Sequence, residues 1–298
     1  MKRALATGLG LVLDRALGEP PAAVHPVAAF GSVMQRVEQR LYRDDRVAGA
    51  AYAAVGVALG AAAGVVVRRP STAVAIAAAG RALRGAAADV RDALEAGDVD
   101  RARTMIPRLV GRDPASLDAS GLAAATIESL AENTVDAVVA PVLWAVIGGA
   151  PGVLAYRAVN TMDAMVGHRS ERYERFGWAS ARLDDVANFV PARLTALLVA
   201  AVRPRYAGAV THAVTTQART HPSPNAGVAE AAFAAALGVE LGGPLRYGNR
   251  DEMRPLLGAG PRPEVRHIDG AITLASHVEL ALAGALAVSS LARRRGAR

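Results

Sequence analysis

The sequence predicts an all-α, polytopic integral membrane protein, with roughly 3–5 hydrophobic helices joined by polar helical or loop segments that carry the site. Its mean hydropathy of +0.22 is too high for an ordinary soluble domain and too low for a chain that lies wholly in a membrane. Hydrophobic residues make up 52% of the chain, and no segment shows the apolar–polar alternation of a strand. We therefore expect a single membrane-embedded domain over residues 1–298.

Three stretches are long enough to cross a membrane. Residues 48–67 and 137–156 carry no charge, and at 1.5 Å per residue each covers roughly 30 Å of hydrocarbon. The second contains Pro141, Gly148, Gly149 and Pro151, which predict a kink or break. Residues 271–291 form the third candidate, although Glu279 lies inside it. The alternative is an alanine-rich soluble bundle, because alanine is a weak hydrophobe and a strong helix former.

Several shorter segments are also predicted to be helical. Residues 4–13 and 194–202 are too short to cross a membrane alone. The first lacks a convincing cleavage site and is expected to be a retained membrane-associated helix, not a signal peptide. Ser71 is the expected N-cap of a helix that runs to about Ala96, and Asp98 starts another that ends near residues 107–111. Three arginines at 293–295 favour a cytoplasmic C-terminus.

Charge and cysteine content exclude some classes of function. The chain has no cysteine, so disulfides and thiolate metal sites are excluded. Its net charge is +7 and Lys2 is the only lysine, but no basic run is interleaved with aromatic residues. We therefore expect no nucleic-acid partner.

A stripe of acidic residues precedes the second predicted span. In a helix that begins near Ser120, Glu128, Glu132 and Asp136 follow one another at intervals of four residues and share one face. Such like charges repel, and a bound Mg²⁺, an arginine or a phosphate-bound metal would offset the repulsion. The alternative is a solvated helix face whose acids suit the helix dipole.

Further polar residues concentrate after that span. Asp163, Asp184 and Asp185 are hard oxygen ligands suited to Mg²⁺. Arg169 and Arg182 are suited to neutralising phosphoryl oxygens.

Three histidines accompany these polar residues. His168 is either a base or a hydrogen-bonded structural residue. His25 and His221 each precede a proline, which favours extended backbone, so they belong either to a site or to rigid turns. No P-loop, Rossmann or zinc-helix motif is present.

Seven motifs occur in order along nearly the whole chain: HPV (25–27), LVGRD (109–113), IESLAEN (127–133), VNTMDAMVGHR (159–169), FGWASARLDD (176–185), HPSPNAG (221–227) and LGGP (241–244). Together they resemble the CobD/CbiB family, the adenosylcobinamide-phosphate synthases of cobalamin biosynthesis. The sequence departs from the family mainly in the alanine-rich first span and the linker that follows it, which lie outside these motifs.

The resemblance implies an enzyme of the cytoplasmic membrane whose catalytic loops face the cytoplasm. The family joins (R)-1-aminopropan-2-ol, or its O-phosphate, to the f propionate of adenosylcobyric acid in an ATP-dependent amide ligation. ATP and Mg²⁺ are thus the expected cofactors. Membrane lipid and other cobalamin-biosynthesis proteins are further expected partners.

The resemblance, combined with side-chain chemistry, suggests a role for each candidate residue. Mg²⁺ or ATP contact is expected at Glu128, Glu132, Asp136, Asp184 and Asp185. The expected catalytic group contains Arg169 and Arg182 for phosphoryl oxygens and His168 or Asp163 for the proton of the attacking ammonium. Expected substrate or phosphate contacts are His25, Arg112, Asn133, Asn160, His221 and Asn225.

Two rival functions are weighed against the ligase. A non-catalytic membrane scaffold that gathers cobalamin enzymes would bind corrinoid without turning over ATP, and the missing P-loop keeps this alternative open. A small-solute transporter would show internal repeats and polar residues within its spans, whereas most polar residues here lie between them.

Overall fold

The computed structural model describes residues 2–20, 25–110, 114–115, 117–168, 170–247 and 250–295. The chain forms two compact units. Unit 1 comprises Met1–Ala79, Asp136–Pro191 and Ala283–Arg298, and unit 2 comprises Gly80–Val135 and Ala192–Leu282. Because each unit is assembled from separated segments, no single cut divides one from the other. The expectation of a single domain over residues 1–298 stays a prediction.

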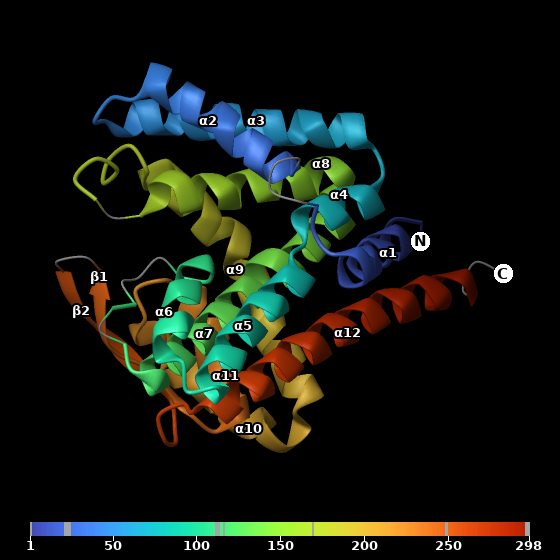
Figure 1. Ribbon diagram of the computed structural model, residues 1–298. Helices are drawn as coiled ribbons and strands as arrows, with labels where there is room; N and C mark the ends of the chain where they lie inside the picture. The colour runs from blue at the N-terminus through green and yellow to red at the C-terminus, as the bar shows by residue number, and fades with distance from the viewer. Residues whose placement is uncertain are drawn as a thin grey trace. The chain divides into compact units, whose positions relative to one another are not determined.

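The regular secondary structure of the described residues is helical apart from one hairpin, which confirms the predicted fold class (Figure 1). The longer helices are α1 (Lys2–Leu17), α2 (Pro26–Leu41), α3 (Arg46–Val67), α4 (Pro70–Ala77), α5 (Gly80–Glu95), α6 (Val99–Met105), α7 (Ala119–Thr134), α8 (Ala140–Met162), α9 (Trp178–Val202), α10 (Ala207–Thr216), α11 (Ala226–Leu237) and α12 (Val265–Arg295). Short helical turns are η2 (Ile106–Arg108), η3 (Val135–Val139), η4 (Asp163–Gly167), η5 (Pro204–Tyr206) and η6 (Ala218–Thr220). The strands are β1 (Glu240–Tyr247) and β2 (Arg250–Gly258).

Among the described residues, four helical segments are long and apolar enough to cross a membrane: Arg46–Val67, Ala119–Gly167, Trp178–Val202 and Val265–Ser290. They include all three predicted spans. Residues 194–202, which are too short to cross a membrane alone, form the end of the 25-residue helix α9, a continuation that was not predicted from the sequence. Charged residues near its start hid that continuity.

The predicted break in the second span is confirmed inside α8. Gly149 has a φ of 66° and a ψ of −151°, which departs from helical geometry two residues before Pro151. A positive φ of this size favours glycine, and proline in turn removes a helical N–H donor. The helix therefore changes direction at Gly149.

In unit 1, α3 packs along α8 through a row of glycines that includes Gly56, Gly60 and Gly64 (Figure 1). A Cβ on Gly60 would lie only 2.6 Å from the carbonyl oxygen of Leu154. Small residues at such an interface let two helix backbones approach closely, which is the usual way that helices associate in membranes.

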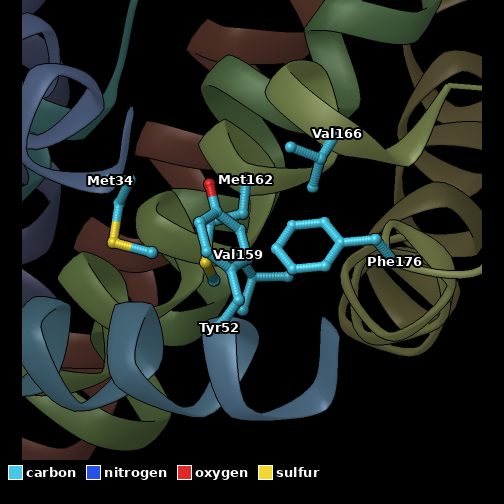
Figure 2. Close-up of a cluster of buried hydrophobic side chains, with 6 residues drawn as sticks. All are labelled: Met34, Tyr52, Val159, Met162, Val166 and Phe176. Carbon is cyan, nitrogen blue, oxygen red and sulfur yellow. The ribbon is translucent and has the colours of Figure 1, made fainter. Parts of the chain in front are cut away.

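A cluster of buried hydrophobic side chains in unit 1 joins α2, α3, α8 and η4. Figure 2 shows the ring of Tyr52, from α3, among side chains from α2, α8 and η4, with Phe176 facing it. The Tyr52 and Phe176 ring centroids lie 5.2 Å apart with the rings tilted, a favourable aromatic arrangement. The cluster thus anchors the segment after η4 against α3. Its members are Met34, Tyr52, Val159, Met162, Val166 and Phe176.

The predicted helix from Ser71 to Ala96 was wrong in two respects: its N-cap is Arg69 and not Ser71, and it is divided into α4 and α5. Pro70 occupies the first turn of α4, and α4 ends at Ala77. The Ala79 N–H donates to the Ala137 carbonyl (3.1 Å). A run of alanines carries no signal for such a break. Asp98 caps α6 as predicted, accepting a hydrogen bond from the Arg101 N–H at 2.9 Å.

Unit 2 contains a hairpin that the sequence did not predict. Strands β1 and β2 pair antiparallel from Glu240 opposite Gly258, with a register shift between Leu241 and Gly243. The side chains of Leu241 and Leu257 are fully buried. Glycines and a proline at 242–244 conceal the period of a strand, which explains why the pattern was missed.

Glu279, the charged residue within the third predicted span, forms an ion pair in unit 2. Glu279, almost completely buried on α12, pairs with Arg84 on α5. Arg91 on α5 also pairs with Asp269 on α12 (2.5 Å). An acid within an apolar helix is tolerated when it meets such a partner.

Candidate functional site

A network of carboxylates and amides forms in unit 1 from three segments that are distant in sequence. The side-chain nitrogen of Asn160 donates to Oδ2 of Asp136 at 3.0 Å and to Oδ1 of Asp184 at 3.3 Å. Asn188 donates to the other oxygen of Asp184 at 3.0 Å. Tyr156 donates to Asn188 at 2.9 Å. We call these five residues the acid–amide network.

Local helix geometry positions each member of the network. Asp136 lies in the π-helical turn η3, and such turns often occur at functional sites because they redirect a side chain. Tyr156 and Asn160 are four residues apart on α8, and so are Asp184 and Asn188 on α9, so each pair shares one helical face. The two carboxylates are thus held together by one shared amide.

Arg182 and Asp185 form a pair of their own next to this network. Their side chains are 2.9 Å apart, the two residues are three positions apart in the helix, and Arg182 is largely exposed. Asp184 therefore turns into the network, while Asp185 contacts the neighbouring arginine. Exposed pairs of this kind contribute little to stability.

The segment after η4 is held to α2 by a buried acid. Glu38 accepts hydrogen bonds from Arg172 at 3.0 Å and from the Tyr173 hydroxyl at 2.9 Å. The Arg172 guanidinium also lies 4.0 Å from the ring centroid of Tyr42, a cation–π contact. Burial and the hydrogen bond to Glu38 raise the pKa of Tyr173 above its ordinary value.

Two of the predicted catalytic residues are His168, at the start of this anchored segment, and Asp163, in the preceding turn η4. His168 is exposed, and its ring meets the Tyr173 ring edge-on at 5.0 Å. Asp163 lies at the start of η4 and is half-buried. Arg169 lies outside the described residues, as does Arg112.

A second polar cluster lies in unit 2, around a cavity of about 190 Å³ lined in part by Glu128, Glu132, His221, Glu230 and Arg254. Nε2 of His221 lies 3.0 Å from the Arg254 guanidinium and 3.7 Å from the Glu230 carboxylate. Glu128, which is buried, accepts a hydrogen bond from the Gly242 N–H at 2.9 Å. The cavity therefore combines three acids with one arginine and one histidine.

Two predicted asparagines make structural contacts in the same unit. Asn133 donates to the carbonyl and hydroxyl oxygens of Ser129, one turn back on its own helix (3.0 and 3.1 Å). Asn225 accepts a hydrogen bond from Arg193 at 2.9 Å.

The predicted metal ligands are distributed between these two clusters. Glu128 and Glu132 line the unit 2 cavity, and Asp136 and Asp184 belong to the acid–amide network of unit 1. Within the parts of the chain that the structure describes, no three His, Asp or Glu side chains are placed to hold a metal ion. Two carboxylates, as in the network, are nevertheless enough when substrate phosphates complete the coordination of Mg²⁺.

The sequence also matches known proteins over most of its length. The family model described as CobD/Cbib protein matches residues 7–275. The chain belongs to the CobD/CbiB family.

Three curated relatives, all named cobalamin biosynthesis protein CobD, illustrate the match. The relative from Mycobacterium tuberculosis is 47% identical over 98% of this chain and 97% of its own length. Those from Geobacter metallireducens and Chromobacterium violaceum are 42% and 41% identical, over 85% and 98% of this chain and 86% and 99% of their own lengths. No solved structure matches at a significant level. Membership of the CobD/CbiB family assigns the chain a role in cobalamin biosynthesis.

The site of this CobD/CbiB chain includes residues that sequence reasoning missed. Arg157 donates to the side-chain oxygen of Asn160 at 3.0 Å and so adjoins the network. A charge just beyond an apolar stretch, three residues from Asn160, was an available signal. Glu230 was detectable as a lone acid in the apolar helix α11. Arg254 was not detectable, because it reaches His221 from the unpredicted hairpin.

Proposed function

We propose that the chain is an ATP-dependent amide ligase that joins (R)-1-aminopropan-2-ol, or its O-phosphate, to the f-propionate carboxylate of adenosylcobyric acid. The product is adenosylcobinamide or its phosphate. The observation that carries the proposal is the convergence of Asp136, Asn160 and Asp184, from three separate family motifs or their borders, on one shared hydrogen-bond centre. Family membership supports the choice of pathway.

The substrate carboxylate must first be activated, because a carboxylate does not acylate an amine at neutral pH. Asp136 and Asp184 are the residues that would hold Mg²⁺, with ATP phosphates as its remaining ligands. When bound, the ion neutralises phosphate charge and so favours phosphoryl transfer. The residues present fit this use, since hard carboxylate oxygens are what Mg²⁺ prefers.

The surrounding side chains hold the two carboxylates in position. Asn160 donates to both of them, and Asn188 fixes the second oxygen of Asp184. Tyr156 orients Asn188 and also donates to the Asp136 carbonyl at 3.2 Å. Second-layer contacts of this kind set the orientation of metal-binding groups.

The turn η4 and the segment between η4 and α9 supply the remaining groups. His168, presented edge-on to Tyr173, is the proposed acceptor of the proton that the attacking ammonium must lose. Asp163 is the alternative acceptor. We propose that this segment faces the cytoplasm, where the corrinoid is made.

The test is amide formation by the purified full chain in detergent. The protein receives adenosylcobyric acid, Mg-ATP and either amine, and product is followed by mass spectrometry. Product should depend on ATP and fall sharply in Asp184→Asn and Asp136→Asn. A folded protein that binds corrinoid but forms no product with either amine would overturn the ligase and favour the non-catalytic scaffold.

A further inference from the structure

The long apolar helices of this chain differ in the side chains that they expose. Both α3 and most of α12 are long and apolar enough to cross a membrane. Length and composition do not separate a helix that contacts lipid from one whose apolar side is covered by protein, because both need apolar residues. The exposed side chains do separate them, since charged groups are costly where a helix faces hydrocarbon.

The exposed face of α3 is apolar along its whole length. From Val47 to Val66, every exposed residue is an alanine, a valine or a leucine, and Leu59 lies near the middle. The opposite face carries the glycines that pack on α8, such as Gly60. With one face packed on protein and the other wholly apolar, α3 fits the hydrocarbon of a bilayer.

Helix α9 has the same character over most of its length. From Val186 to Val202, each exposed residue is apolar, and Phe189, Val190 and Leu197 are the other large ones. The side chains of Val186, Val190 and Leu197 follow at helical spacing and therefore share one face. This part of α9 also fits a lipid surroundings.

The first half of α12 shows the opposite arrangement. Arg266, Asp269, Thr273 and His277 follow one another at intervals of three or four residues, so they share one helical face. This face is exposed, and even the side chain of Asp269 is 50% accessible. Leu280 is the first large apolar residue on it. Residues 265–282 thus form an amphipathic helix whose polar side faces out, which is the pattern of a helix on the surface of a soluble unit.

Helix α5, which lies beside α12 in unit 2, is polar on its outer side as well (Figure 1). Arg91 on α5 pairs with Asp269 on α12, and Asp89 on α5 pairs with Arg108 at 2.8 Å. The side chains of Asp89 and Arg108 are 47% and 60% exposed. If this face met hydrocarbon, half-exposed charges would have to leave water, which is costly even for paired groups.

Helix α7 does not expose an apolar face either. Within unit 2, it packs against α5, α6, α11 and β1. Of its residues Ala119–Thr134, Glu132 is the exposed one. The apolar composition of α7 is therefore explained by burial in protein and requires no lipid.

We propose that α3 and α9 contact the hydrocarbon of the bilayer, whereas α7 and residues 265–282 of α12 belong to a part of unit 2 that is surrounded by water. Two segments that composition marks as membrane-spanning then lie outside the membrane. The polar cavity of unit 2, which Glu128 and Glu132 of α7 help to line, also lies outside the hydrocarbon. This division is independent of the proposed ligase activity.

The test uses single cysteines, which give no background because the chain has none of its own. Thr273→Cys on α12 and Leu59→Cys on α3 both replace exposed residues, so protein shields neither. The full chain is placed in phosphatidylcholine nanodiscs, in which both membrane surfaces are open to water, and receives a charged maleimide. Thr273→Cys should react at least about tenfold faster than Leu59→Cys, because apolar surroundings suppress the reactive thiolate.

Each other outcome of the labelling contradicts one part of the proposal. Protection of both cysteines until the protein is denatured in SDS would overturn it and place α12 across the membrane. Rapid reaction of both would overturn the lipid contact of α3.

A spin label on each cysteine, attached in detergent before reconstitution, separates shielding by lipid from shielding by protein. Oxygen, which concentrates in hydrocarbon, should relax the label at position 59 more strongly. A water-soluble nickel chelate should relax the label at position 273 more strongly. The reverse pattern would overturn the proposal.

A matched pair of charged variants tests the same division without labels. Thr273→Arg should accumulate in the membrane fraction and unfold thermally like wild type, because position 273 faces water and lies four residues after Asp269. Leu59→Arg should accumulate at least about tenfold less, because a charge in mid-span disfavours insertion. Equal losses in the two variants would overturn the proposal.

Discussion

The side-chain amide of Asn160 donates a hydrogen bond to the carboxylate of Asp136 across 3.0 Å, although 24 positions separate the two residues in the chain. The π-helical turn η3 directs Asp136, and α8 supplies Asn160 from beyond its bend at Gly149. The contact therefore depends on two departures from regular α-helix between the partners. An apolar span needs neither the turn η3 nor the bend at Gly149. Both lie between or at the residues whose side chains, Asp136 and Asn160, they bring together.

The acid–amide network should be essential for activity. Asp184→Asn keeps the shape of the side chain but removes a negative charge, and amide formation should fall by at least about tenfold. Steady-state rates with Mg-ATP measure the effect. Asp100→Asn is the matched control, because Asp100 is exposed on α6 and pairs only with Arg103 in the described part of the chain. Equal rates for the two variants would contradict the assigned role.

Replacing Glu38 should loosen the segment that carries His168. Glu38→Gln weakens the contacts with Arg172 and Tyr173, so amide hydrogen exchange over residues 170–177 should become faster. Glu174→Gln, at an exposed position of the same segment, should leave exchange unchanged. Slow exchange in both variants would mean that Glu38 does not anchor the segment.

The phenol of Tyr173 should ionise later than an ordinary tyrosine. Burial and Glu38 raise its pKa in the folded protein, so the neutral form is favoured by folding. Its contribution to stability is complete below the unfolded pKa of about 10 and is lost as pH rises through the higher folded value. The absorbance titration of wild type minus Tyr173→Phe should show this transition above pH ~10. A difference curve centred below that pH would disprove the shift.

The close contact of α3 and α8 should not tolerate a larger residue at Gly60. A Cβ there would meet the Leu154 carbonyl oxygen at 2.6 Å, so Gly60→Val should destabilise unit 1 by about 1–3 kcal/mol. Thermal unfolding in detergent measures the change. Gly85→Ala on α5 is the comparison, since a Cβ there meets nothing within 4 Å and should be neutral or stabilising. Similar melting temperatures for both variants would argue against the packing.

Removal of one member of the Arg84–Glu279 pair should cost more than removal of both. Glu279 is almost fully buried, so Glu279→Gln leaves the Arg84 charge uncompensated and should destabilise the protein by about 3–5 kcal/mol. The double variant Arg84→Met with Glu279→Leu should recover much of that loss. A double-mutant cycle followed by thermal unfolding tests the coupling, and additive effects would show that the pair is not coupled.

Hydrophobicity and side-chain type made much of this structure predictable. Charge-free stretches predicted spans, Asp98 predicted a helix start, and Gly149 with Pro151 predicted the bend. The pairing of Glu279 with Arg84 was not predictable, because local pattern does not show which distant residue meets a buried acid. Likewise, the four-residue spacing of Glu132 and Asp136 implied one acidic helix face. In the structure, Asp136 belongs to the π-helical turn η3 and its carboxylate accepts a hydrogen bond from Asn160.

The order of α3 and α8 along the chain has a consequence for the synthesis of the protein. The glycine row of α3 leaves the ribosome before its partner α8, and roughly 70 residues of chain lie between them, so at about 5–20 residues per second the delay is about 4–14 s. During that interval the glycine face meets lipid, the translocon or a chaperone instead of α8. Insertion of α3 and its final packing are therefore separate events in the biogenesis of this protein.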